Sequence, residues 1–144
     1  MERTSQNNVH YAGIPNGVVM PHTTIDQLNV LLAELTARVD CIRGIVISSA
    51  DGLKIADRFR DHSYDTPIAH AISASIVGLA NKSVRNLSLP PSDRIVIYTG
   101  EGIVAVFNLG NASLLALLDP DANVGLVMIE LQHTAEKVKK VMRL

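Results

Sequence analysis

The stretch that decides the fold is Gly44-Ile-Val-Ile-Ser-Ser-Ala-Asp-Gly-Leu-Lys-Ile-Ala56. Two short apolar runs flank Asp51-Gly52, and their β-branched residues alternate as they do in a half-buried strand. Asp-Gly favours a tight type I′ turn, because glycine takes a positive φ without steric cost. The stretch therefore predicts a β-hairpin with strands over 44–49 and 53–59.

A helix is predicted on either side of this hairpin. Leucines at helical spacing predict the first one, from Thr24 to about Asp40. The second runs over 67–87, where Pro67 suits a first helical turn and Thr66 is its expected cap. This middle helix is apolar over a wide arc, which indicates burial on two sides. We expect a second copy of the chain to cover one side; a central helix in a monomeric core is the alternative.

Three strand-like runs follow the middle helix, over 94–99, 103–108 and 113–118. Glycine-containing turns join them, which predicts an antiparallel meander. A last amphipathic helix covers 124–143. The order predicts an α/β sandwich, α-β-β-α-β-β-β-α, with one mainly antiparallel five-stranded sheet. We expect helices on both faces, with the first and last helices sharing one face and the middle helix on the other.

The length of 144 residues fits one domain, which we assign to 23–144, after a flexible polar tail at 1–22. Aromatic residues make up only 3% of the chain, so we expect an aliphatic core and few rings for stacking on bases. A net charge of −1 without a basic block outside the last helix argues against nucleic-acid binding.

The single cysteine, Cys41, excludes an intrachain disulfide and a cysteine-based zinc site, and we expect it to be a small buried apolar group. No apolar run approaches the ~20 residues that span a bilayer, which argues against membrane insertion. The polar N-terminus does not resemble a signal peptide, so we expect a cytoplasmic protein.

Two patterns in the sequence imitate ligand sites. Asp119, Asp121, Asn123 and Glu130 occupy positions 1, 3, 5 and 12 of a calcium-loop template, but the template needs glycine where Val124 stands. Helix capping by Asn123 and a proline-shaped turn explain the same residues. A second pattern, 100–105, imitates a dinucleotide fingerprint but joins strand to strand, where that fingerprint joins strand to helix. The histidines are scattered, and no nucleophile elbow is present, so we predict no catalytic, cofactor or metal site.

The polar residues of the middle helix are the remaining candidates for recognition. If the apolar arc pairs with another copy, these residues border the joint, where they suit either a protein partner or solvent. They are His70, Ser73, Asn81, Lys82 and Arg85.

The order of these features resembles the roadblock (dynein light-chain, bacterial MglB-like) family. The resemblance covers 24–143, and its most specific parts are strand-Asp51-Gly52-strand and Ala122-Asn-Val-Gly-Leu126. In that family, two chains pair through the middle helix and the strand after it, which joins two sheets into one. The resemblance therefore implies a homodimer, or a heterodimer with a paralogue. The implied interface contains Ile72, Ala74, Ile76, Gly78, Leu79, Ile95 and Ile97.

Members of this family regulate or scaffold small Ras-like GTPases, so the resemblance implies a regulator that binds such a GTPase and stimulates GTP hydrolysis. Bacterial members commonly accompany a GTPase and a sensor-kinase-like protein, which is therefore another implied partner. Fixing the switch loops would suffice, because hydrolysis depends on positioning and charge stabilisation. Neither Arg85 nor Arg94 has motif support as an inserted arginine. The alternatives are a non-catalytic scaffold in a signalling or motility complex, a small-ligand sensor and an enzyme in its own right.

Overall fold

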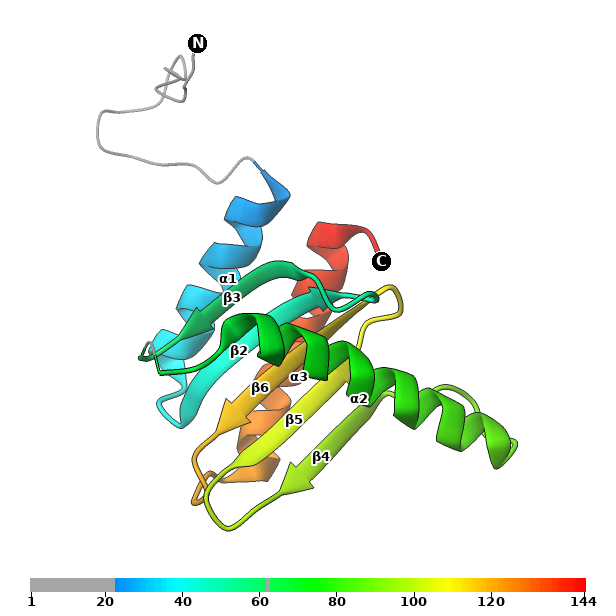
Figure 1. Cartoon of the computed structure of the whole chain (residues 1–144). Coiled ribbons are helices and arrows are strands. Elements are labelled where there is room, and N and C mark those ends of the chain that lie inside the picture. Colours follow the sequence, from blue (N-terminus) through cyan, green and yellow to red (C-terminus); the bar gives the residue numbers. More distant parts are fainter. Residues whose placement is uncertain (1–22, 62) are drawn as a thin grey trace.

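The computed structural model describes residues 23–61 and 63–144, and the predicted tail at 1–22 lies outside them. The chain folds in the predicted order of helices and strands (Figure 1). The elements are α1 (Thr24–Arg38), β2 (Ile42–Ser49), β3 (Lys54–Phe59), α2 (Thr66–Asn86), β4 (Arg94–Tyr98), β5 (Ile103–Asn108), β6 (Ala112–Leu118) and α3 (Val124–Met142).

The five strands form one sheet in the order β3-β2-β6-β5-β4, and every neighbouring pair is antiparallel. The hairpin β2–β3 joins the meander β4–β5–β6 through β2 and β6, whose residues pair from Ile42 to Ser49. This order puts β3 and β4 at opposite edges of the sheet. The prediction of one antiparallel five-stranded sheet is confirmed.

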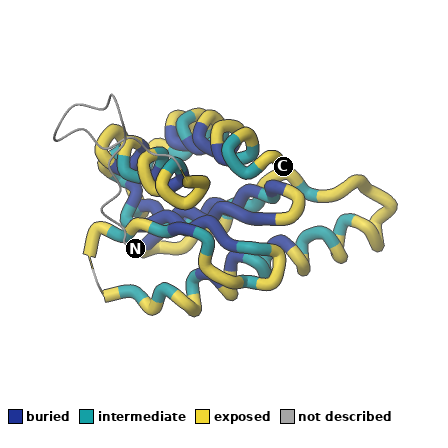
Figure 2. Tube along the Cα trace, turned by 90° about the horizontal axis from the view of Figure 1, so that it is seen from above, coloured by how far each residue is buried: buried dark blue, intermediate teal, exposed yellow. Residues whose placement is uncertain are grey.

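The helices form two layers around the sheet, as the view from above shows (Figure 2). α1 and α3 pack against each other on one face, and α2 lies alone on the other (Figures 1 and 2). Alternate residues of each strand serve the two layers: Ile45 and Ile47 belong to the large core under α1 and α3, and Val46 belongs to a smaller core under α2. The predicted arrangement of the three helices is confirmed.

The hairpin turn differs in type from the predicted one. Gly52 has a φ of 82°, but Asp51 does not have a positive φ, so the turn is not type I′. Ser49 N–H donates to the carbonyl of Leu53, which makes a three-residue loop closed by a left-handed glycine. A Cβ at position 52 would lie 3.2 Å from the Cα of Ala71, so Gly52 also lets the loop approach α2. The second strand accordingly begins at Lys54, one residue later than predicted.

Polar side chains cap the N-termini of α2 and α3, and one of them belongs to the calcium-like pattern. Asp65, and not Thr66, caps α2 by accepting a hydrogen bond from the N–H of Ile68. Asn123 caps α3 through the N–H of Leu126, as the capping interpretation predicted.

The two outer carboxylates of that pattern are held in ion pairs. Asp119 pairs with Arg43 at 2.7 Å, and Glu130 pairs with Arg38 at 3.0 Å. The hydrogen bond to Asp119 raises the pKa of Arg43 further above its usual value. Capping and ion pairing therefore account for three of the four calcium-like residues.

Gly44 is required by its cross-strand neighbour. It stands opposite Phe59, and a Cβ at position 44 would overlap the Phe59 ring. Replacing Gly44 by alanine forces that ring out of its packed position, so we expect a loss of about 1–3 kcal/mol in the free energy of unfolding, measured by urea denaturation. Gly100→Ala is the matched control, because a Cβ there meets nothing within 4 Å. Equal stability of the two variants would contradict the expected overlap.

Candidate functional site

The wide apolar arc of α2 is divided between the sheet and the surface. The residues of α2 that the sheet buries are His70, Ser73 and Val77, which follow one another at three and four residues. The large apolar residues Ile68, Ile72 and Leu79 are not covered by the sheet, and each is at least 45% exposed. The sheet therefore covers only part of the apolar arc, at Val77 and partly at Ile76, and it also buries the polar side chains of His70 and Ser73.

A hydrogen-bonded network lies where α2 crosses the sheet. His70 Nδ1 lies 2.7 Å from Ser48 Oγ on β2, and His70 Nε2 lies 2.8 Å from Asp57 Oδ2 on β3. One turn along α2, Ser73 Oγ lies 2.7 Å from Ser113 Oγ on β6. Ser48 and Ser113 are direct cross-strand partners, so the two contacts are adjacent. All of these polar groups except Asp57, whose side chain is 14% exposed, are buried. Their hydrogen bonds to one another fix where α2 sits on the sheet.

The sequence predicts that His70 and Ser73 lie among the polar residues that border the joint between two copies, but the structure places them elsewhere. His70 and Ser73 are 1% and 0% exposed, so the expectation that their side chains border the outer face of the helix is wrong. The expectation of a purely aliphatic core is wrong at the same place. The missed signal is the alternation of β2, which puts Ser48 on the same buried side as Val46.

Ser48, His70 and Asp57 have the connectivity of a hydrolase triad, but they cannot act as one. Ser48 is fully buried and His70 is 1% exposed, so no substrate reaches the hydroxyl group. The role of the three residues is to anchor α2 to β2 and β3.

Cys41 also lacks the environment of a nucleophile. It is half-buried and packs against the large core. Burial raises the pKa of its thiol above the usual value, so little thiolate exists at neutral pH.

An apolar groove of about 360 Å³ lies between the exposed flank of α2 and the part of the sheet that α2 leaves uncovered. Ile72 and Ile76 of α2 form one wall, and Ile97 of β4 lies on the sheet side. The remaining lining residues are Phe59, Tyr64, Asp65, Ile68, Ala69, Val104, Leu115 and Leu117. The C-terminal part of α2 projects past the edge strand β4 (Figure 1). Because Ile97 belongs to the edge strand β4, the groove reaches this edge; the groove, the projecting helix and the β4 edge are the candidate surface.

The seven predicted interface residues do not all lie on this surface. Ile72, Ile76 and Ile97 surround the groove, and Leu79 is 68% exposed on the outer side of α2. Ile95 is half-buried in the smaller core.

The two small residues lie on the other flank of α2. Ala74 lies against the chain's own Gly52 turn, with its Cβ 3.5 Å from the position of a Cβ on Gly52. Gly78 is four residues further on, beside open space. The helical spacing of 100° per residue separates this small-residue flank from that of Ile72 and Ile76.

The other polar residues of α2 have separate roles. Asn81 accepts hydrogen bonds from the N–H and the hydroxyl of Ser92, at 3.0 and 2.8 Å, and so holds the loop before β4. Lys82 and Arg85 are exposed. Arg94 lies 5.8 Å from the centre of the Phe107 ring.

The fold and this surface can be compared with known proteins. A model of the Roadblock/LC7 domain matches residues 28–119, which is more than half of the chain. The chain belongs to the Roadblock/LC7 domain family. The matched span covers most of α1, the hairpin, α2 and the meander, so it includes both parts of the candidate surface.

This Roadblock/LC7 chain is similar in sequence to one curated protein and in fold to solved structures. The uncharacterized protein MJ1340 of Methanocaldococcus jannaschii is 27% identical over 109 residues, which cover 76% of this chain and 94% of that protein. Myxococcus xanthus MglB superposes with a TM-score of 0.78 at 14% identity, covering 88% of this chain and 95% of its own. The gliding protein MglB of Thermus thermophilus superposes with a TM-score of 0.76 at 14% identity, covering 89% of this chain and 97% of its own. At these identities the two MglB structures show a shared fold.

Two further properties bear on the role of this Roadblock/LC7 domain. None of the helices in 23–61 and 63–144 is long and apolar enough to cross a membrane. In the same residues, no group of three histidine, cysteine, aspartate or glutamate side chains is placed to hold a metal ion.

Proposed function

We propose that the chain forms a homodimer through α2 and the free edge of β4, and that this dimer binds and regulates a small Ras-like GTPase. The observation that carries the dimer is the surface shared by α2 and β4. It combines an open apolar groove with a strand, β4, that pairs on one side only among the residues that the structure describes. Exposed apolar surface of this extent, next to an unpaired strand, is typical of a protein interface.

The geometry of the dimer follows from strand alternation. Antiparallel pairing of β4 with β4 of a second copy would join the two sheets and put Ile95 and Ile97 of both copies on the α2 side. The projecting end of each α2 would then lie over the groove of the other copy, which would cover Ile72, Ile76 and Leu79. The pairing is isologous, as expected for a twofold homodimer.

Family membership and fold support the GTPase as partner. The MglB structures, one of them described as a gliding protein and another as a tetrameric arrangement, share this fold. The chain offers no accessible nucleophile in its buried serine–histidine network, so its proposed action is on the conformation of the GTPase. Lys82 and Arg85 are exposed on the projecting part of α2, where they are placed to contact acidic groups of the partner.

The deciding experiment measures GTP hydrolysis by the Ras-like GTPases of the same genome, with and without this protein. We expect single-turnover hydrolysis by one of them to accelerate by at least about tenfold, well within the range that partner proteins supply to GTPases. The rate should saturate as the dimer concentration rises. Lys82→Glu should raise the half-saturation concentration, and Lys137→Glu on α3 is the matched control, because both lysines are exposed. Binding without acceleration would instead indicate a scaffold, and absence of binding would overturn the proposed partner.

A further inference from the structure

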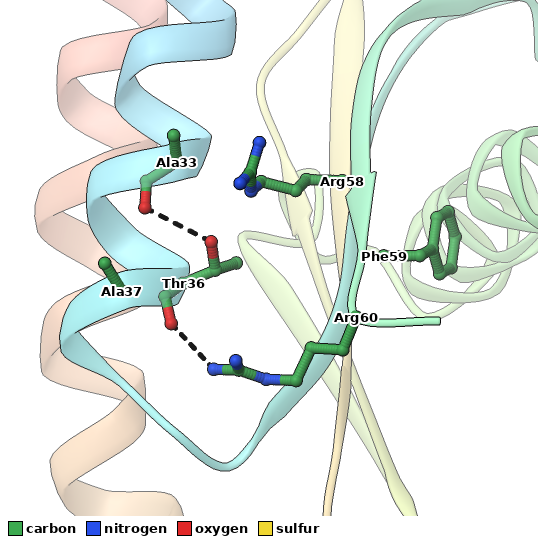
Figure 3. A pocket seen from close by; sticks show the side chains of 6 residues that line it. All are labelled: Ala33, Thr36, Ala37, Arg58, Phe59 and Arg60. Carbon is green, nitrogen blue, oxygen red and sulfur yellow. Dashed lines mark hydrogen bonds between the residues drawn. The ribbon is translucent and has the colours of Figure 1, made fainter. Parts of the chain in front are cut away.

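A second groove lies at the opposite edge of the sheet, between α1 and β3. It encloses about 290 Å³ and is lined by Ala33, Thr36, Ala37, Arg58, Phe59 and Arg60. Figure 3 shows that Arg58 and Arg60 extend from β3 and its end toward α1, whereas Phe59 between them points to the other face. The two alanines on α1 are small, which leaves the space that the arginines border.

Arg60 is held in place without a neutralising charge. Its guanidinium donates to the carbonyls of Thr36 and Val39 at the end of α1, at 2.6 and 3.0 Å, and to the carbonyl of Ile42. The carbonyls of a helix C-terminus are where a cation is favoured. Arg60 therefore caps the C-terminus of α1. Its positive charge remains in the groove, because the lining contains no carboxylate to neutralise it.

Arg58 carries the second positive charge. It is exposed, and its guanidinium lies above the groove near Ala33 (Figure 3). Within 23–61 and 63–144, no carboxylate lies within ion-pair distance of either arginine. The lining contains two arginines and no acidic residue, so the groove is complementary to an acidic group.

The strand beside this groove has a free edge. Arg60 N–H donates to the carbonyl of Arg43. Hydrogen-bonded pairs recur at every second residue of an antiparallel ladder, so residues 60, 58 and 56 are the ones that exchange hydrogen bonds with β2. Asp57 and Phe59 consequently direct their N–H and C=O groups away from β2. Within 23–61 and 63–144, β3 pairs only with β2, and it lies at the edge opposite to β4. The proposed dimer, which uses β4, therefore does not cover this edge.

We propose that an extended acidic segment of a partner protein adds to the free edge of β3, with one of its carboxylates paired to Arg58. Backbone hydrogen bonds to Asp57 and Phe59 would supply the alignment, and the groove over Ala33 and Ala37 would receive the carboxylate side chain. The inference does not rest on the proposed regulation of a GTPase, because it concerns the other edge and the other face.

The test uses a synthetic peptide of about six residues, the usual length of a strand, with alternating glutamate and valine. It is titrated into the full-length, isotope-labelled protein, and amide chemical shifts are followed by NMR. We expect shifts confined to β3 and the adjoining part of α1. Replacing glutamate by glutamine in the peptide should weaken binding about three- to fivefold, the effect of one partly exposed ion pair.

Variants of the protein separate this site from general charge attraction. Arg58→Gln should weaken binding of the glutamate peptide to the same extent and should remove its advantage over the glutamine peptide. Lys137→Gln, on the far side of α3, should leave both affinities unchanged. Shifts outside β3 and α1, equal binding of the two peptides, or no shift at millimolar peptide would overturn the proposal and would leave Arg58 as a charge that protects the strand edge from aggregation.

Discussion

Ile72→Asp is expected to convert the dimer into a folded monomer. Ile72 is 45% exposed in the single chain, so an aspartate there stays hydrated and the fold is retained. In the proposed dimer the same carboxylate would be buried against the second copy without a partner, which should weaken association by at least about a hundredfold. Light scattering over a dilution series should give twice the 15.5 kDa chain mass for the wild type and the single mass for the variant.

Leu126→Asp is the matched control for this experiment. Leu126 is 62% exposed near the start of α3, on the opposite face of the sheet, and the substitution makes the same chemical change. It should keep the dimer mass. If Ile72→Asp also keeps the dimer mass while remaining folded, the groove beside α2 is not the interface, and the proposed pairing through β4 fails with it.

His70→Ala is expected to be the most destabilising substitution on α2. It removes the shared partner of Ser48 and Asp57, and it leaves a cavity under the helix. The cavity, the unpaired hydroxyl of buried Ser48 and the loss of one ion-pair partner of Asp57, which keeps Lys54 at 3.7 Å, should together lower the free energy of unfolding by about 3–4 kcal/mol. Urea denaturation followed by circular dichroism measures this loss.

His133→Ala serves as the comparison, because His133 is exposed on α3 and should change stability by less than about 0.5 kcal/mol. One ordinary hydrogen bond contributes about 1 kcal/mol. If His70→Ala lowers the free energy of unfolding by less than this, water or neighbouring groups replace the ring. The network would then not be what holds α2 on the sheet.

The fold was largely predictable from local signals. The hairpin, the meander and the three helices appear at their predicted places, because strand alternation, helical spacing and turn residues are properties of adjacent residues. The errors are small and have local causes. Asp65 outcompetes Thr66 as the cap of α2 because its carboxylate reaches the N–H of Ile68, and Gly52 closes a longer turn than the type I′ turn that was expected.

The candidate site was less predictable, because its composition depends on which side of α2 meets the sheet. Periodicity identified an apolar arc, but it could not say that Ile72 and Leu79 remain exposed. His70 and Ser73 look like surface residues on a helical projection. They are buried because Ser48, Asp57 and Ser113, which are distant in sequence, provide their hydrogen-bond partners.

Local sequence is therefore sufficient for the kind and order of the elements, for a single α/β sandwich and for the family, since these depend on patterns within short segments. Only the tertiary structure decides the rotation of α2, the open groove and β4 edge, and the paired arginines beside β3. Each of these depends on contacts between residues far apart in the chain, such as His70 with Asp57 or Arg60 with Thr36. Burial and charge compensation at those contacts are properties of the assembled layers, and no single segment contains them.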